Sequence, residues 1–587
     1  MKKIYLLLIA ALVALSLCAC DTTPPDISTE TTPGGVDTTP TPDTSLPEDT
    51  SADVSNNDIF IVANGKANFA VVRADKASSA EISAARKVWE AIKSATGATP
   101  TFKTDAVTWS QPHDPEALEI LVGITSHDES TKVLSELDYG DYIIRFEGKK
   151  LVVTSYSEEG LVRAAASLST YITEHGSEGT LAISADHNVT GTALSMLNGL
   201  PYYTGGKANM VTDCGNKNYM IYVSETTPEA YSEYCASLES AGYSLYTTHE
   251  AAGNKFATYT NAEYTVNAYF TDYSDSVRVV VEPLSTLPVR QQDVKDSSAL
   301  KYEPAVRMVG IEYDYGGDEL MQNGMLYIFR LPDGKLIVFD GGGKHNYIPD
   351  LLMQNLREMS PDPNNIVIAA WVLTHAHSDH TGGFVVFADK YASSVKVETI
   401  IHNFSTTAQY SAISDSGLYS KAMDTMKKYA GAKIIKAHSG QVFCYGGAEM
   451  EVLYTVEDLY PKALDAGNSA SLIVRMYMGG QKVLMLADSY ITSSDILCDM
   501  YGSYIKSDIV QVSHHGAVGG TVELYTLIDA RTALQPIGQG HRYKFLKNPE
   551  IICVTGLAKD YFVAGSDVVT LTLPYTPVGN NPDYTGS

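Results

Sequence analysis

One stretch of the chain, IVIAAWVLTHAHSDHTGG, restricts the fold and the chemistry more than any other part of the sequence. An apolar run at residues 366–373 indicates a buried strand, and four potential metal ligands follow it: His375, His377, Asp379 and His380. Residues two apart in an extended segment face the same side, so the first two histidines can hold one ion. The aspartate and the last histidine can reach a second ion beside it. By chance, such a pattern is expected on the order of once in a thousand chains of this length.

Three further motifs also follow apolar strands. Asp340 ends LIVFD, Asp488 follows QKVLMLA, and His514 and His515 follow DIVQVS. Taken singly, a turn aspartate, a helix cap and a loop histidine pair would explain them. Their order and their common position at strand ends favour one shared site. The glycine pair at 382–383 is expected to let the backbone turn into a helix after the histidine motif.

These motifs together resemble the metallo-β-lactamase superfamily, whose HxHxDH signature the chain matches at every position, and the resemblance extends over residues 305–576. It implies an α/β fold, an αββα sandwich with a metal pair at one edge. It further implies that Asp340 supports the ligand loop from behind and that Asp488 bridges the two ions. One of His514 and His515 would be the last ligand of the second metal, and the sequence leaves open which one.

The chain departs from the general family pattern at the third motif. The segment AGNSASLIVRM has Asn468 and Ser469 where a third histidine of the first metal is usual. This arrangement is similar to a subgroup that contains the lactamase-like domain of bacterial DNA-uptake channels and the choline-phosphate esterases of teichoic acid, which are linked with phosphoester substrates. The first metal is then expected to bind more weakly, because an amide oxygen is a poorer zinc ligand than imidazole.

Three other histidines are candidates for the site. His402 and His438 are candidates for the missing ligand, although a surface or core histidine is the more economical interpretation of each. His541, within GQGHRYKF, matches the subgroup and would bind a phosphate oxygen or protonate the leaving group. A histidine packed in that loop is the alternative.

The N-terminus resembles the signal of a bacterial lipoprotein. Two lysines precede an apolar stretch at residues 4–17, which is too short to span a membrane, and Ala19 precedes Cys20. We expect residues 1–19 to be removed and Cys20 to carry the lipid, which would anchor the protein at the cell surface. An ordinary cleaved signal is the alternative. Residues 20–57 are rich in Thr and Pro and are expected to form a disordered stalk.

The length of 587 residues exceeds what one hydrophobic core organises. We expect two small α/β domains, at residues 58–190 and 195–290, before the hydrolase-like domain at 301–587. In the first, Ser78 and Glu81 form a capping box for a helix that ends at Gly97. Its pattern resembles an accessory domain found before several glycoside hydrolases, which suggests a glycan partner.

The second small domain has a helix that begins at Pro228 with Thr227 as its cap, followed by tyrosine-rich strands. A half-buried sheet explains the tyrosines better than stacking on sugars. Cysteines after position 20 are odd in number and widely spaced, so free thiols are expected, and only Cys214 and Cys235 are worth testing as a disulfide.

The expected function is hydrolysis with two zinc ions, or Mn or Fe in their place, and a hydroxide held between them that Asp379 orients. Phosphodiester bonds of cell-wall or other extracellular polymers are the leading substrates. The formal net charge of −27 argues against a stable nucleic-acid partner. Asn468 argues against a β-lactamase. An acyl ester or thioester hydrolase, and a glycan-binding surface lipoprotein with little turnover, remain as alternatives.

Overall fold

The computed structural model describes residues 57–107, 112–284, 287–290, 300–311, 313–314, 320–321, 324–415, 417–538, 542–565 and 567–586. The expected signal, the expected lipidation site Cys20 and residues 20–56 of the expected stalk lie outside the described residues, and so does His541. Within the described ranges, no helix combines the length and the apolar character that crossing a membrane requires. Residues 55–587 form one compact unit.

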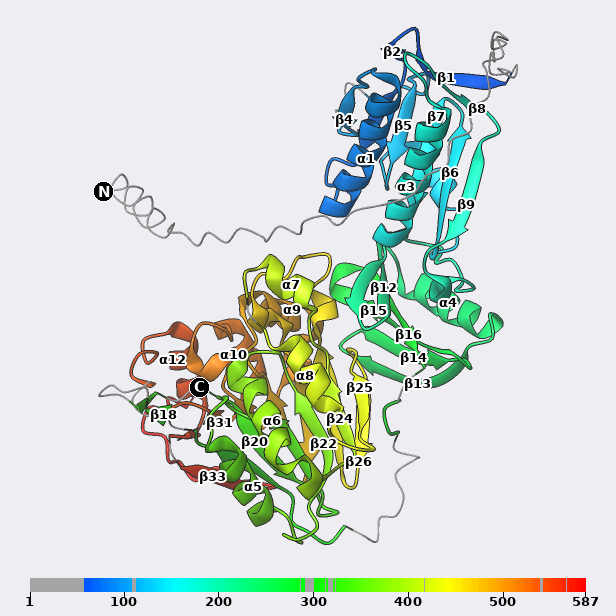
Figure 1. Ribbon diagram of the computed structural model, residues 1–587. Helices are drawn as coiled ribbons and strands as arrows, with labels where there is room; N and C mark the ends of the chain where they lie inside the picture. The colour runs from blue at the N-terminus through cyan, green and yellow to red at the C-terminus, as the bar shows by residue number, and fades with distance from the viewer. Residues whose placement is uncertain are drawn as a thin grey trace, which may run out of the picture. The chain divides into compact units, whose positions relative to one another are not determined.

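The region at residues 58–192 is built on a six-stranded sheet of order β4-β3-β5-β7-β6-β9, on which α1 and α3 pack side by side (Figure 1). A separate small sheet has the order β2-β1-β8. The predicted capping box of Ser78 and Glu81 and the stop at Gly97 are confirmed, and β6 and β7 pair antiparallel as a hairpin. The elements are β1 Asp58–Ala63, β2 Lys66–Ala67, β3 Ala70–Arg73, α1 Ser79–Thr96, β4 Phe102–Thr104, β5 Glu119–Val122, α2 Asp128–Leu134, β6 Asp141–Glu147, β7 Lys150–Ser155, α3 Glu158–His175, β8 Leu181–Ser184 and β9 Asn188–Thr192.

The middle region is an antiparallel sheet of order β10-β12-β16-β15-β14-β13, with β11 paired to β12. Tyr231 and Tyr234 of α4 are buried against one face, and Tyr269 is buried on the other, as expected for a packed sheet. Cys214 and Cys235 are free thiols, so the disulfide is absent. The elements are η1 Ser195–Leu197, β10 Lys207–Ala208, β11 Thr212–Gly215, β12 Asn218–Ser224, α4 Pro228–Ser240, β13 Ser244–Ala251, β14 Asn254–Thr260, β15 Tyr264–Thr271, η2 Asp272–Ser274 and β16 Ser276–Pro283.

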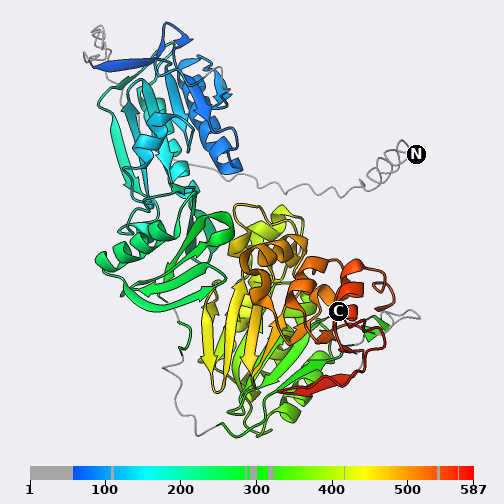
Figure 2. The same ribbon diagram turned by 180° about the vertical axis from the view of Figure 1, so that it is seen from behind.

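The C-terminal region consists of two sheets packed face to face, each covered by helices on its outer side. The first sheet has the order β25-β24-β22-β21-β20-β17-β33 and the second β26-β27-β28-β29-β30-β31-β32. One core lies between the sheets, a second lies under α5, α6 and α8, and a third lies under α9, α10 and α12. Figure 1 shows the first helix layer in front of β20, β22 and β24, and Figure 2 shows the yellow-to-orange strands of the second sheet from behind. The predicted αββα sandwich is therefore present.

The elements of its first half are β17 Ala305–Val309, β18 Tyr313–Asp314, β19 Leu320–Met321, β20 Leu326–Arg330, β21 Leu336–Asp340, α5 Ile348–Met359, β22 Val367–Leu373, α6 Ser378–Tyr391, η5 Ala392–Ser394, β23 Lys396–Val397, β24 Thr399–His402, α7 Thr407–Ala412, α8 Tyr419–Met426 and β25 Lys433–Lys436. Those of its second half are β26 Val442–Tyr445, β27 Ala448–Tyr454, η6 Val456–Leu459, η7 Gly467–Ala470, β28 Ile473–Met478, β29 Gln481–Met485, α9 Ile491–Tyr501, η8 Gly502–Ile505, β30 Ile509–Gln511, η9 Ser513–Gly516, α10 Val522–Ile528, β31 Thr532–Gln535, α12 Pro549–Leu557, β32 Asp560–Val563 and β33 Val568–Thr572.

The prediction for the glycine pair was wrong. Helix α6 begins at Ser378, so Gly382 and Gly383 lie inside the helix rather than before it. Their role is close packing, because a Cβ on Gly383 would lie 1.8 Å from the carbonyl oxygen of Gly341. The Gly383 N–H donates instead to the carbonyl of Gly342 at 2.7 Å. The helix thus meets the loop after β21 backbone to backbone, which holds the start of α6 beside Asp340.

Candidate metal centre

The candidate ligands gather where parallel strands of the two sheets end. His375 and His377 follow β22, Asp379 and His380 occupy the first turn of α6, and Asp488 follows β29. The remaining two, His514 and His515, lie in η9 after β30, and both have left-handed backbone conformations with φ of 47° and 55°. Left-handed conformations cost non-glycine residues free energy and are often found at functional sites.

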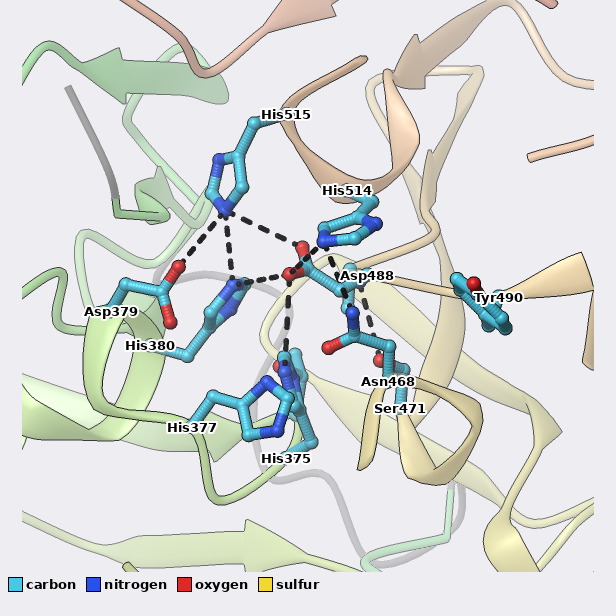
Figure 3. A network of polar contacts seen from close by, with 12 residues as sticks. His375, His377, Asp379, His380, Asn468, Ser471, Asp488, Tyr490, His514 and His515 are labelled. Carbon is cyan, nitrogen blue, oxygen red and sulfur yellow. Dashed lines mark hydrogen bonds and ion pairs between the residues drawn. The ribbon is translucent and has the colours of Figure 1, made fainter. Parts of the chain in front are cut away.

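Four of these residues form one tight group. Asp379, His380, Asp488 and His515 each offer a ligand atom, and these atoms lie within 4.8 Å of one another. His380 Nε2 is 3.1 Å from Asp488 Oδ2 and 3.3 Å from His515 Nε2, which is 3.5 Å from Asp379 Oδ2 (Figure 3). Ligands bound at about 2.0–2.2 Å from one ion lie about this far apart. The group can therefore hold a cation.

A second group of nitrogen atoms approaches Asp488 from another side. His375 Nε2 and His514 Nε2 are each 3.9 Å from Asp488 Oδ2, and the rings of His375 and His377 are 4.5 Å apart between centroids. The Asn468 side-chain amide donates to His514 Nε2 at 3.1 Å (Figure 3). The two adjacent histidines therefore separate: His515 lies with Asp379 and His380, and His514 lies beside Asn468.

The hydrogen bonds of the histidine rings show whether the residues fit a pair of metal ions. Each ring has one nitrogen held by a protein group outside the centre. These pairs are His375 Nδ1 with Thr374 Oγ1, His377 Nε2 with Asp415 Oδ2, His380 Nδ1 with Asp340 Oδ2, His514 Nδ1 with the Val518 carbonyl and His515 Nδ1 with the Pro536 carbonyl. Metal-bound histidines are typically held in this way through the nitrogen that does not bind the metal.

Buried polar atoms without partners also indicate that the residues fit a pair of metal ions. His375 Nε2, Asp488 Oδ1 and Asn468 Oδ1 are buried, and among the described residues none of them has a hydrogen-bond partner. An unpaired buried polar atom costs free energy. Cations placed among these atoms would remove that cost, so the residues present fit the metal pair that the fold implies.

Asp340 contacts both ends of the loop that carries the candidate ligands, at Thr374 and at His380. Its carboxylate accepts from the Thr374 N–H and hydroxyl, both at 2.8 Å, and lies 2.7 Å from His380 Nδ1. The side chain is fully buried, and its φ of 56° is left-handed. Asp340 therefore orients the His380 ring with Nε2 toward Asp488.

Burial dominates the electrostatics of the centre. It lowers the pKa of His375 well below its usual value, and the nearby His380 lowers it further. Burial also acts to lower the pKa of His380, but the carboxylates of Asp488 and Asp340 outweigh it and raise this pKa well above its usual value. Burial acts to raise the pKa values of Asp379 and Asp488, yet neighbouring imidazoles hold both below their ordinary range. Both carboxylates are thus ionised at neutral pH, the form that binds cations.

Other candidates from the sequence lie elsewhere. His438 is fully buried, with Nδ1 2.8 Å from Glu457 and Nε2 3.6 Å from Glu282, and so is not the missing ligand. His402 is a core residue, and burial lowers its pKa to about 3. The hydroxyl of Ser469 donates to Asp465. The interpretation of both histidines as core residues is therefore the correct one.

Two residues next to the ligand loop had no signal in the sequence. Asp415 contacts His377, and the Tyr410 hydroxyl accepts from the Ala376 N–H at 3.3 Å. Both lie in the connection between β24 and α8, which carries no motif. Only three-dimensional contact identifies them.

The comparison with family models agrees with the fold. Residues 318–429 match the family model described as Metallo-beta-lactamase superfamily. The C-terminal region has the metallo-β-lactamase fold. No curated protein matches the chain.

Solved structures similar to the chain include the metallo-β-lactamase fold protein YhfI from Bacillus subtilis, at 14% identity over 46% of this chain and 100% of that chain, with a TM-score of 0.29. CmlA, a diiron β-hydroxylase from Streptomyces venezuelae, is 13% identical over 60% of this chain and 79% of that chain, with a TM-score of 0.29.

Proposed function

We propose that this protein is a hydrolase that uses two divalent metal ions, with zinc as the first choice and Mn or Fe as alternatives. The observation that carries the proposal is the position of Asp488, whose carboxylate lies between two sets of imidazole nitrogens. When bound, two such ions activate a water molecule as the nucleophile near neutral pH and stabilise negative charge on a phosphoryl or acyl oxygen.

The chain's own residues divide between the two positions. His375, His377 and His514 would hold the first ion, Asp379, His380 and His515 the second, and Asp488 both. This assignment makes His514 the replacement for the histidine that Asn468 displaces. In this assignment both histidines after β30 are ligands, on different ions.

The exposed members of the set mark the side from which substrate enters. The side chains of His377, Asp379 and His514 are 22%, 28% and 24% exposed, whereas those of His375 and His380 are fully buried. Asp379, at the open side, is placed to orient the attacking water. Asn468 lies beside His514, where its amide can contact a substrate oxygen.

We propose phosphodiester bonds of cell-wall or other extracellular polymers as the substrate. The support is the lipoprotein-like N-terminus, which favours a location on the outer face of the membrane through Cys20, and the subgroup likeness around Asn468. The net charge of −27 argues against nucleic acid as the polymer. His541, at the position the subgroup uses, is the proposed proton donor to the leaving group.

The test combines metal analysis with three generic substrates. The mature chain, purified and analysed by inductively coupled plasma mass spectrometry, is expected to contain two metal ions and to hydrolyse bis(p-nitrophenyl) phosphate. Chelation should remove the activity, and zinc should restore it. Turnover of p-nitrophenyl acetate in place of the phosphodiester would favour an acyl esterase. Tight metal binding without turnover of phosphodiester, ester or lactam would favour the binding-protein alternative.

A further inference from the structure

The connection between β24 and α8 forms two hydrogen bonds with the ligand loop, the segment at residues 374–380. Ala376, which separates the two histidines of the first position, donates its N–H to the Tyr410 hydroxyl at 3.3 Å. Its carbonyl accepts from the Leu418 N–H at 2.6 Å. Tyr410 is buried, with 2% of its surface exposed. The backbone between His375 and His377 is therefore fixed by a segment outside the sandwich motifs.

The same segment supplies a carboxylate to His377. Asp415 Oδ2 lies 2.8 Å from His377 Nε2, and the Asp415 N–H donates to the Tyr410 carbonyl at 2.9 Å. Because Nε2 donates to the carboxylate, Nδ1 becomes the ring nitrogen that can bind an ion. The pair mirrors Asp340 and His380, in which the carboxylate takes Nδ1 and leaves Nε2.

A third segment, which contains Gly467, packs against the hydrogen bond between Asp415 and His377. A Cβ on Gly467 would lie 2.3 Å from Asp415 Oδ2 and 2.4 Å from His377 Nε2. Real Cβ atoms do not approach that closely, so only glycine leaves the pair intact. Gly467 directly precedes Asn468. The segment that departs from the family's third motif therefore also contacts the Asp415–His377 pair.

We propose that Asp415 is a positioning residue for the first metal position, where its carboxylate fixes the His377 ring and strengthens Nδ1 as a ligand. The inference rests on the proposed function. A carboxylate behind a ligating imidazole increases the basicity of the ring, and loss of such a partner typically weakens metal binding by about 10-fold to 100-fold. A position that lacks the usual third histidine gains most from this support.

The experiment measures metal binding rather than turnover. Metal-free mature protein is titrated with Zn²⁺ against a chromogenic chelator, and with Co²⁺ followed by its visible absorption. The wild type is expected to bind two ions. Asp415→Ala should weaken the binding of one ion by about 10-fold to 100-fold and leave the other unchanged. The affinity of Asp415→Asn for that ion should lie between the affinities of the wild type and of Asp415→Ala, because its amide oxygen still accepts the His377 N–H.

Two further variants isolate the cause. Gly467→Ala keeps Asp415 but displaces the pair, and should weaken the same ion as Asp415→Ala. Asp424→Asn removes an exposed carboxylate of α8 that pairs with Lys427, and should bind both ions as the wild type does. The unfolding temperature of metal-free Asp415→Ala should equal that of the wild type, which a purely structural role of Asp415 would not allow.

Three outcomes overturn the inference. Both affinities in Asp415→Ala could remain within about twofold of wild type, or both could fall together with the unfolding temperature. Either result refutes the role of Asp415 and leaves the proposed function standing. A wild-type chain that binds fewer than two ions contradicts the proposed function, and the inference with it.

Discussion

The candidate metal centre and the junction between the middle sheet and the C-terminal region are both buried clusters of charged and histidine side chains, but among the described residues only the first gathers several possible metal ligands at one place. At the junction, Arg278 donates to the carbonyls of Glu457, Asp458 and Tyr460. His438 lies between two glutamates. At the candidate metal centre, by contrast, ligand atoms of Asp379, His380, Asp488 and His515 lie within 4.8 Å of one another.

This difference separates a structural cluster from the proposed functional one. The junction carries positive and negative groups that pair with one another, such as His438 and Lys436 with Glu457. The candidate centre places imidazole nitrogens and two carboxylates of low pKa together, an arrangement that can bind added cations. Burial of a histidine alone does not distinguish the two cases, because His375 Nε2 and His438 Nε2 are both buried without a hydrogen bond. The number of ligand atoms that gather around the histidine does.

Substitution at the open side of the centre should have the largest effect. Asp379→Ala removes a proposed ligand and the group proposed to orient water, and kcat/KM for the phosphodiester should fall on the order of 10³-fold or more, the scale for loss of a central catalytic group. The fold should remain, because this side chain is 28% exposed. Kinetics and circular dichroism together check this, and an unchanged rate would rule out the proposed centre.

Breaking the junction should affect stability instead. Arg278→Ala leaves the buried carbonyls of Glu457, Asp458 and Tyr460 without their donor, and is expected to cost about 1–3 kcal/mol of unfolding free energy. Urea unfolding measures this. Lys390→Ala, which breaks the exposed pair with Asp350, is the control and should change stability by about 1 kcal/mol or less. Equal effects of the two substitutions would remove the distinction between the clusters.

The two adjacent histidines should separate in a metal titration. In the proposed assignment, His515→Ala should weaken the binding of the ion near Asp379 and His380, and His514→Ala the binding of the ion near His375 and His377. Loss of a direct ligand should weaken binding by more than the about 10-fold to 100-fold that loss of an outer partner causes. If both variants lost the same ion, the assignment of His514 to the first position would be wrong.

The junction should also respond to pH, with a smaller effect. Burial acts to lower the pKa of His438, but Glu457 and Glu282 raise it to about 9. An unfolded chain has the ordinary histidine value of about 6.5. The stabilisation is therefore complete below about pH 6.5 and is lost as the pH rises toward 9. Differential scanning fluorimetry of metal-free protein should show this loss in the wild type, and His438→Gln should show a flatter profile. Parallel profiles would contradict it.

Local patterns predicted much of this structure because the interactions that fix them are local. The helix with Ser78 and Glu81 has its cap within four residues, and the ligand loop after β22 follows one apolar strand. The separation of His514 from His515 was not predictable, because it depends on left-handed conformations at both residues. The division into separately folding domains stays a prediction.

Contacts between segments far apart in the sequence could not be predicted, because no local pattern encodes them. Asp415 and His377 are 38 residues apart, and Gly467 approaches both from a third segment. No spacing rule connects these positions. The glycine pair of α6 was misinterpreted because a turn and a close backbone contact both require glycine, and only the neighbouring Gly341 tells them apart.

The proposed metal pair is tested by a crystal structure of the zinc-loaded protein with anomalous diffraction recorded at the zinc edge. We expect two peaks about 3.5–4 Å apart, with Asp488 in contact with both. His380, His515 and Asp379 should surround one peak, and His375, His377 and His514 the other. No peak among these residues, or ions bound elsewhere on the chain, would contradict it.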